Sequence, residues 1–190
     1  MSAKSAQAAQ LSLRETLSGR SARKSRLEQE VEQIFAQLRE PVYRYVIGIV
    51  DSPAEAEDIA QEAFLRLFAA LRKGEKIRLA PAWVFRTAYN LAIDRCRVRG
   101  KTEPLDPEVL RKAPLGATPA TQERRFWDAE RARKLEQALE LLSPQERRCL
   151  DLRAEGLRFR EIAAALDVGI STVETFLARA AKKLSKEIHV

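Results

Sequence analysis

The residue types that most often perform catalysis are scarce in this 190-residue chain. The only histidine, His189, stands one residue from the C-terminus, where chain ends usually fray, so it cannot support a Ser/His/Asp or Cys/His catalytic set. Cys96 and Cys149 lie far apart in the sequence without a nearby histidine, which favours two buried thiols over a disulfide framework or a zinc site. We therefore expect no enzyme, no cofactor and no small-molecule substrate.

Residues suited to binding DNA stand near the C-terminus. The stretch Glu161–Val173 is typical of a helix-turn-helix, with the small Ala163 where two helices cross and Asp167 at the turn, a position that often takes glycine. The apolar residues expected to fix the second helix are Leu166, Val168, Val173 and Leu177. The expected contacts to base edges and phosphates are Ser171, Thr172, Glu174, Thr175, Ala178, Arg179, Lys182 and Lys183. A solvated face, or a purely structural helical hairpin, is the alternative reading.

Three amphipathic helices are predicted before residue 100. Apolar residues recur at three- and four-residue steps over 27–49 and again over 56–71, with a bend expected near Pro41 and a turn at 51–53. The third helix begins near Pro81, where a helix start tolerates proline, and runs to about Arg99. Residues 1–26 lack sustained periodicity and are predicted to form a flexible basic tail.

The remaining chain divides into a linker and a second helical domain. Four of the eight prolines fall within 101–127, which predicts a flexible linker. Beyond it, the serine, proline and glutamate at 143–146 combine a helix cap with a capping box, and Gly156 is expected to end that helix. Short and long helices over 159–166 and 170–186 follow. The fold class is all-α, with two small domains at 27–100 and 128–190.

Charge is unevenly distributed along the chain, whose net charge is +7. Residues 28–62 hold 9 acidic and 2 basic residues, whereas residues 63–101 hold 2 acidic and 10 basic residues. An acidic block is therefore followed directly by a basic block, which by itself fits a solvated surface as well as a nucleic-acid face. No apolar run approaches the roughly 20 residues that span a bilayer, so we expect a cytoplasmic protein without membrane insertion.

The sequence AEDIAQEAFLRLF at 56–68 and PAWVFRTAYNLAIDR at 81–95 resemble sigma region two, and residues 135–186 resemble sigma region four. Because only a short linker separates them, with nothing similar to region three, the chain resembles the extracytoplasmic-function (ECF, group 4) sigma factors of the bacterial sigma-70 family. The resemblance covers about residues 28–100 and 128–187. It implies a subunit that binds core RNA polymerase and directs promoter recognition, DNA melting and transcription initiation.

The resemblance also implies roles for particular residues. Region two would bind the clamp helices of the largest polymerase subunit through Asp58, Gln61, Glu62, Phe64 and Leu65. It would hold the opened minus-ten strand through Arg72, Lys73, Lys76, Arg78, Trp83, Arg86, Asn90, Arg95, Arg97 and Arg99. Region four would bind the flap of the second-largest subunit and read the minus-thirty-five element through its helix-turn-helix. An anti-sigma factor is the further expected partner.

Alternatives remain for the roles of two residues, Glu174 and Trp83, and for the function of the chain. Glu174 stands where many relatives carry a basic residue, so an unusual minus-thirty-five preference is expected. Trp83 fits core packing at least as well as a place at the melting surface. A LuxR-like helix-turn-helix regulator that is not a polymerase subunit is the second functional hypothesis, although it leaves residues 28–100 unexplained. An enzyme or a structural adaptor comes third.

Overall fold

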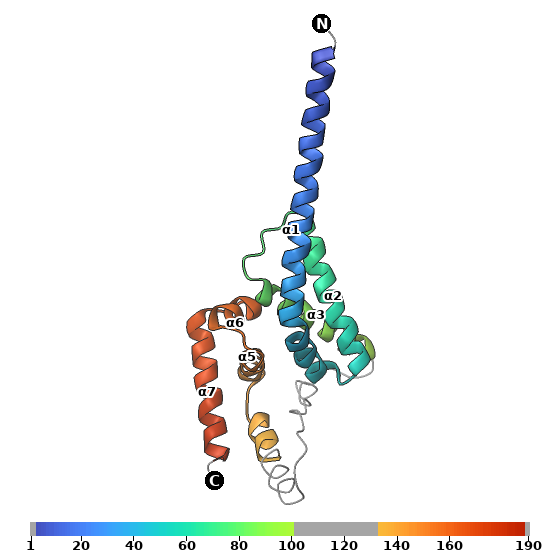
Figure 1. Cartoon of the computed structure of the whole chain (residues 1–190). Coiled ribbons are helices and arrows are strands. Elements are labelled where there is room, and N and C mark those ends of the chain that lie inside the picture. Colours follow the sequence, from blue (N-terminus) through green and yellow to red (C-terminus); the bar gives the residue numbers. More distant parts are fainter. Residues whose placement is uncertain (1–2, 101–132, 189–190) are drawn as a thin grey trace, which may run out of the picture.

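The computed structural model describes the backbone of residues 3–100 and 133–188, and the side chains of 27–100 and 133–186. These residues form helices and no strand. The amino-terminal half contains α1 (Ala3–Val50), α2 (Pro53–Arg72) and α3 (Ala80–Arg99). The carboxyl-terminal half contains a helical segment at 133–140, then α5 (Pro144–Ala154), α6 (Phe159–Leu166) and α7 (Ile170–Ile188) (Figure 1). The predicted linker at 101–127 and the predicted domain start at 128 lie outside the described residues.

Helices α1, α2 and α3 pack around one apolar core. The side chains of Val42, Val46, Leu67 and Val84 are completely buried there, as expected from the three- and four-residue spacing of apolar positions. Tyr45 packs edge-on against Phe85, with 5.3 Å between ring centroids. This core holds the outer faces of α1 and α2 side by side and sets α3 across them.

Local signals determine where the helices begin and turn. The hydroxyl of Ser52 accepts a hydrogen bond from the backbone N–H of Glu55, and Pro53 follows it at the first position of α2. Gly74 ends the same helix with a positive φ of 87°, a conformation that glycine adopts without steric cost. The predicted turn between the first two helices and the predicted start of the third helix are therefore confirmed.

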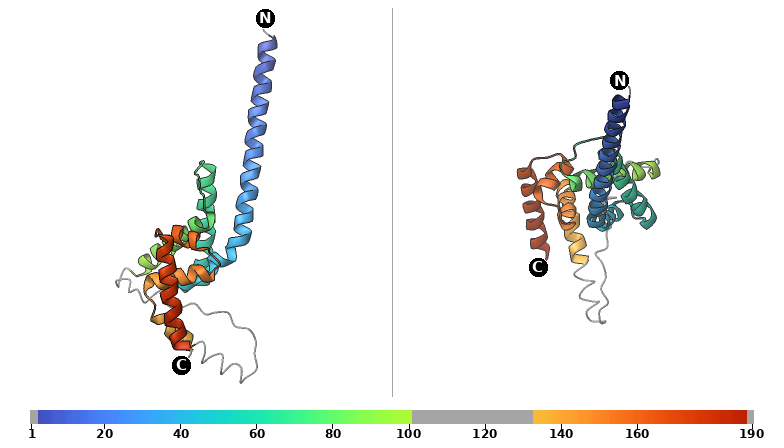
Figure 2. Two further views of the ribbon diagram at one scale, coloured as in Figure 1. Left: turned by 90° about the vertical axis from the view of Figure 1, so that its left-hand side faces the viewer. Right: turned by 45° about the horizontal axis from the view of Figure 1, so that its top comes forward.

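Helix α1 is longer than predicted. Residues 3–26 continue it without interruption, whereas the sequence indicated a flexible tail, and this part extends away from the other helices (Figure 1). The segment contains five alanines and no proline, but also five serines and Gly19, so its composition permits a helical backbone despite the lack of an apolar stripe. Pro41 lies inside α1, and Figure 2 shows that the helix changes direction in its carboxyl-terminal part.

The carboxyl-terminal half is a small helical unit, and tight turns end its helices α5 and α6. Ser143 and Glu146 form the predicted capping box at the start of α5, and Gly156 follows that helix with a φ of 90°. Asp167 ends α6 in the left-handed conformation, with a φ of 58°, and thereby turns the chain into α7. Ile162 and Val173 are buried where α6 and α7 meet, which completes a helix-turn-helix.

Candidate functional site

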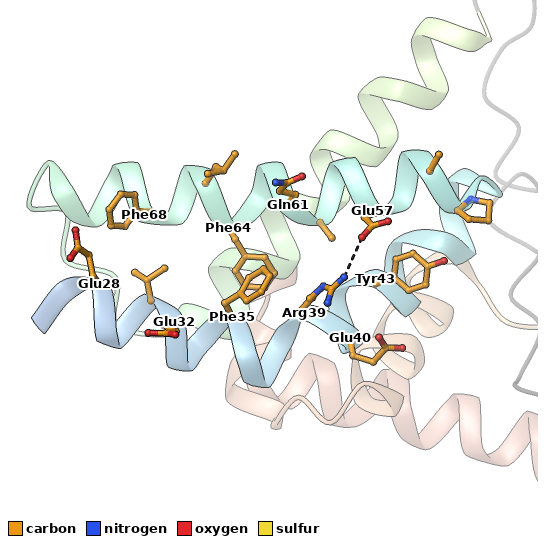
Figure 3. Close-up of a pocket in the computed structure, with 15 residues that line it drawn as sticks. Glu28, Glu32, Phe35, Arg39, Glu40, Tyr43, Glu57, Gln61, Phe64 and Phe68 are labelled. Carbon is orange, nitrogen blue, oxygen red and sulfur yellow. Dashed lines mark hydrogen bonds and ion pairs between the residues drawn. The ribbon is translucent and has the colours of Figure 1, made fainter. Parts of the chain in front are cut away.

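A groove lies between α1 and α2. Its volume is about 770 Å³, and its lining combines apolar side chains, Phe35, Phe64 and Phe68 among them, with the carboxylates of Glu28, Glu32, Glu40 and Glu57 (Figure 3). Phe35 of α1 packs edge-on against Phe64 of α2, with 4.9 Å between ring centroids, while Arg39 pairs with Glu57 across the groove at 3.2 Å. Such a surface suits an amphipathic helix with basic residues along its flank.

Of the five residues expected to bind polymerase, three line this groove and two do not. Gln61, Phe64 and Leu65 line it, whereas the exposed Asp58 and half-buried Glu62 lie outside the lining, on α2. Glu62 forms an ion pair with Arg66 at 2.8 Å. The Phe64 side chain is only 5% exposed, so it supports the core, whereas Leu65 is 57% exposed and free to meet a partner.

The contribution of α1 to the groove was not predicted from the sequence. Helix α1 contributes Glu28, Glu32, Phe35 and Glu40 to the lining, beside the α2 residues. The block of acidic residues over 28–62 already indicated that α1 shares the charge of α2. Which face of α1 lies beside α2, however, depends on the packing of the two helices.

Two smaller pockets flank Trp83, at the loop between α2 and α3. The first, of about 360 Å³, is lined by Lys73, Thr87 and Asn90 together with Arg66, which the sequence analysis did not single out. The second, of about 440 Å³, is lined by Lys76, Arg78 and Arg86, and also by Ala164 of α6. Trp83 itself is half-buried and packs on the core, as one of the two earlier readings expected, while its place at the melting surface stays a prediction. Aromatic and amide groups ringed by cations suit unstacked bases and their phosphates.

Three of the arginines expected on the minus-ten strand take different positions. Arg95 and Arg97 are exposed, and Arg97 pairs only with the nearby Asp94, at 3.7 Å. Arg99 instead donates a 2.8 Å hydrogen bond to the carbonyl of Val50 and pairs with Glu55. Arg99 therefore joins the ends of three helices, a structural role that the sequence analysis did not foresee.

Arg86 is likewise engaged within the protein. Its Nε donates to the carbonyl of Ala165 at 3.1 Å, and its terminal nitrogen donates to the carbonyl of Ala164. The carboxylate of Asp167 lies 3.7 Å away. Because these partners belong to α6, this expected DNA contact is turned toward the carboxyl-terminal half.

The outward face of α7 carries most of the expected duplex contacts. Ser171, Glu174, Thr175, Ala178, Arg179 and Lys182 are exposed, and Thr172 is half-buried. Thr175 donates its hydroxyl to the carbonyl of Ser171 at 2.8 Å. The face therefore offers two cations beside the carboxylate of Glu174, as expected for a helix that reaches both phosphates and bases.

Lys183 departs from that group. Its ammonium donates to the Glu146 carboxylate at 2.7 Å and to the Leu141 carbonyl at 3.0 Å. Burial would raise the pKa of Glu146, but hydrogen bonds from Lys183 and from the Ser143 backbone hold this pKa below its ordinary value. The lysine therefore neutralises a buried carboxylate, and its expected contact with DNA stays a prediction.

Reactive groups are absent from these surfaces as far as the structure describes them. Cys96 and Cys149 are both buried and free, and burial raises the pKa of the Cys149 thiol to about 11. Within residues 3–100 and 133–188, no group of His, Cys, Asp and Glu side chains is placed to hold a metal ion. None of the described helices combines the length and apolarity that a membrane span requires.

Two family models match the chain in consecutive order. Sigma-70 region 2 matches residues 34–102, and Sigma-70 region 4 matches residues 132–184. The first match contains the Trp83 pockets and the groove apart from its lining residues Glu28, Val31 and Glu32, and the second contains the helix-turn-helix. The hypothesis of a regulator without region two is therefore not favoured.

Curated sigma factors are similar to this chain over most of its length. The chain is 30% identical to the RNA polymerase sigma-E factor of Streptomyces coelicolor over 84% of this chain and 86% of the relative. It is 28% identical to ECF RNA polymerase sigma factor SigW of Bacillus subtilis, over 79% and 84%. It spans 59% of the length of ECF sigma factor SigE of Mycolicibacterium smegmatis, at 30% identity over 80% of this chain.

Two solved structures share the fold. Sigma factor RpoE of Bartonella quintana, in complex with the anti-sigma factor NepR, aligns with a TM-score of 0.56 and 19% identity, covering 85% of this chain and 98% of RpoE. CnrH, in complex with the cytosolic domain of CnrY, aligns with a TM-score of 0.54 and 20% identity, covering 84% and 87%. With both family models and these relatives, the chain belongs to the extracytoplasmic-function sigma factors of the sigma-70 family, the subunits that direct RNA polymerase to promoters.

Proposed function

We propose that this chain is a group 4 sigma factor whose three binding surfaces are the α1/α2 groove, the Trp83 pockets and the outward face of α7. The groove and the adjacent acidic face of α2 bind the clamp helices of the largest polymerase subunit. Region four contacts the flap of the second-largest subunit. The chain performs no chemistry of its own, and its place is the cytoplasm, with polymerase and DNA.

The observation that carries this proposal is the separation of charge on one three-helix unit. Acidic residues border an apolar groove on α1 and α2, while cations gather around Trp83 and Asn90 at the α2–α3 loop. The first surface fits a basic protein helix and repels DNA. The second holds backbone phosphates and gives an unstacked base an aromatic and an amide contact, which is what strand capture requires.

Promoter binding follows from the same division. The face of α7 with Arg179 and Lys182 enters the major groove of duplex DNA at the minus-thirty-five element. Asn90 and Trp83 receive a base of the opened minus-ten strand, with Lys73 on its phosphates. Glu174 favours cytosine, whose N4 amine can donate to a carboxylate, and disfavours close phosphates.

The test of the polymerase surface is direct binding of the full chain to sigma-free core polymerase. Leu65→Asp places a charge on the exposed apolar edge of the groove, and Asp58→Lys with Glu62→Lys reverses the acidic face. We expect each variant to weaken the association at least tenfold. Glu136→Lys with Glu140→Lys makes the same charge change on the exposed side of segment 133–140 and serves as the matched control. Unchanged binding by both the Leu65→Asp variant and the Asp58→Lys/Glu62→Lys variant would refute this assignment.

We also propose that an anti-sigma protein binds this chain. Both structural neighbours were solved with anti-sigma or companion proteins, NepR and CnrY, which supports such a partner here. Phe35 and Leu65 are exposed in the groove of the free subunit, and an exposed apolar surface of this kind favours a binding partner when polymerase is absent. Co-purification with a partner that competes with core polymerase, and that Leu65→Asp releases, tests this proposal.

A further inference from the structure

The single helix α1 carries opposite charge in its two parts. Its first part, residues 3–26, holds six basic residues and one acidic residue. Its second part, residues 27–50, holds two basic and four acidic residues and contributes one side of the groove. The sign of the charge changes between Arg26 and Glu28, so the two parts of α1 suit different partners.

The change of sign lies where α1 runs past the end of α2. Phe35 packs against Phe64, and Glu28 and Phe68 lie at the same end of the groove (Figure 3). The two helices are therefore antiparallel, and each earlier turn of α1 lies beside a later turn of α2. Because α2 ends at Arg72, one turn beyond Phe68, most of the first part of α1 extends beyond α2. Figures 1 and 2 show it projecting from the three-helix unit.

Three of the basic residues continue the face of α1 that lines the groove. Arg20, Arg23 and Lys24 stand 11, 8 and 7 residues before Val31, separations that are close to whole turns of a helix. Val31 and Phe35 line the groove beside α2. In the register of the helix, a face that is apolar along α2 therefore becomes cationic beyond the end of α2.

The segment that follows α2 at this end of the unit is the loop to α3. Residues 73–79 hold three basic residues and one acidic residue, and the side chains of all four are exposed. Lys73 and Lys76 line the pockets beside Trp83 that are proposed to hold the opened strand. The basic part of α1 and this basic loop thus stand at the same end of region two, and a polyanion that touches both relieves the repulsion between them.

The composition of the first part of α1 favours nucleic acid over a membrane or a protein groove as its partner. It lacks the sustained apolar stripe with which an amphipathic helix enters a lipid surface or a hydrophobic groove. The segment 3–26 extends for about 36 Å at about 1.5 Å per residue, the length of roughly ten base pairs of duplex DNA. Cations along a helix of this length match the phosphates along about one turn of duplex.

We propose that residues 3–26 form a basic arm that binds the phosphate backbone of the duplex DNA adjoining the opened minus-ten strand. This inference rests on the proposed function, because it takes the loop at 73–79 as the segment that binds the opened strand. At the edge of the opened region that strand re-enters a duplex, and the arm gives this duplex a positively charged support. Because the arm contacts phosphates, it strengthens binding without regard to base sequence and makes the affinity more dependent on salt.

The test is binding of the full, free chain to two fluorescent DNA probes over a range of salt concentrations. The first probe is a single strand of about 12 nucleotides, and the second joins the same strand to a duplex of about 15 base pairs. Arg20→Gln/Lys24→Gln should weaken binding to the second probe by about fivefold at about 0.1 M salt. It should also lower the slope of log affinity against log salt by about 2, because each phosphate contact contributes about 0.9 to this slope. Binding to the first probe should not change.

The matched control removes the same charge from the second part of the same helix. Arg39→Gln/Arg44→Gln replaces two cations that form ion pairs with Glu57 and Glu155. We expect this variant to bind both probes within about twofold of the wild-type chain, with an unchanged salt slope.

A further variant tests whether the helix is needed in addition to the charge. Ser25→Pro keeps every cation of the arm but interrupts α1 between the arm and the groove, because proline removes a helical hydrogen bond and clashes with the preceding turn. A proline is tolerated in the first turn of a helix, so the rest of α1 should remain intact. We expect binding to the second probe to weaken by about threefold and binding to the first to stay the same. Wild-type binding by Ser25→Pro overturns the helical arm.

Equal affinity and equal salt slope of Arg20→Gln/Lys24→Gln and the wild-type chain on the second probe also overturn the inference. A loss of affinity for core polymerase in place of DNA assigns the segment to a protein partner and overturns it as well. The proposed function is tested separately by Lys73→Gln/Lys76→Gln, which should weaken binding to both probes. If this variant binds both probes as the wild-type chain does, the strand-binding loop is wrong, whatever the result for the arm.

Discussion

Among the side chains described at 133–186, Glu146 is the charged residue that is classed as buried, at 4% exposure. It accepts from the backbone N–H of Ser143 at 2.9 Å and from Lys183 at 2.7 Å. A buried carboxylate with both partners is stable, whereas one that loses its counter-ion retains the full cost of desolvation. The residue therefore links the start of α5 to α7 by charge as well as by capping.

Lys183→Met should lower the free energy of unfolding by about 2–3 kcal/mol at pH 7, because it leaves that carboxylate unpaired. Lys182→Met, at the exposed neighbouring position, should change it by less than about 0.5 kcal/mol. Urea denaturation of both variants measures the difference. Equal stability of the two variants would show that the ion pair between Lys183 and Glu146 does not stabilise the fold.

The same pair predicts a dependence on pH. Because the pKa of Glu146 is lower in the folded protein than its ordinary value of 4.5, its stabilising contribution is complete above that value and is lost as the pH falls below it. The stability difference between the wild-type protein and Lys183→Met should therefore shrink between pH 6 and pH 3.5. A constant difference across this range in urea titrations would contradict the ion pair.

Substitutions of the neighbouring residues Phe64 and Leu65 on α2 should affect stability and polymerase binding differently. Phe64→Ala removes a buried ring that packs against Phe35 and should cost about 3–4 kcal/mol of stability. Leu65→Ala truncates an exposed side chain, so we expect stability to change little and polymerase affinity to fall. Thermal unfolding and core-binding assays on both variants check this contrast. A Leu65→Ala protein with unaltered affinity would place the contact elsewhere.

At the scale of single elements, turns and caps could be predicted accurately because their causes are local. Ser143, Gly156 and Asp167 each take the backbone conformation that their own side chains or neighbours favour. The partners of the long cations could not be predicted in this way. Arg86 and Arg99 bond largely to backbone carbonyls, which every residue type carries, so no pattern in the sequence records such a contact.

The turn between α6 and α7 offers a prediction for one element. Asp167 has a φ of 58°, which is strained for a branched side chain and free for glycine. Asp167→Val should destabilise the carboxyl-terminal half by about 1–2 kcal/mol, whereas Asp167→Gly should lie within about 0.5 kcal/mol of wild type. Both remove the same carboxylate, so their comparison isolates the backbone. Equal losses in chemical denaturation would show that the turn conformation is not the cause.

At the scale of the whole molecule, the order of acidic, basic and helix-turn-helix segments could be predicted, but their assembly could not. Helix periodicity assigns a buried stripe to each helix, and two stripes suffice to predict a core. The groove depends on which face of α1 lies beside α2, and the contact between α3 and α6 joins residues about 80 positions apart. Residues 3–26 also differ from the prediction, since α1 continues through a segment in which the sequence shows no sustained apolar periodicity.

The central claim is that this chain confers promoter-specific initiation on RNA polymerase. Run-off transcription on a promoter library, with purified sigma-free core polymerase as the only other protein, tests it most directly. The account predicts discrete transcripts that require this chain and that weaken at least tenfold with Asn90→Ala/Lys73→Glu. An absence of transcripts, or transcripts only after a different sigma factor is added, would contradict it.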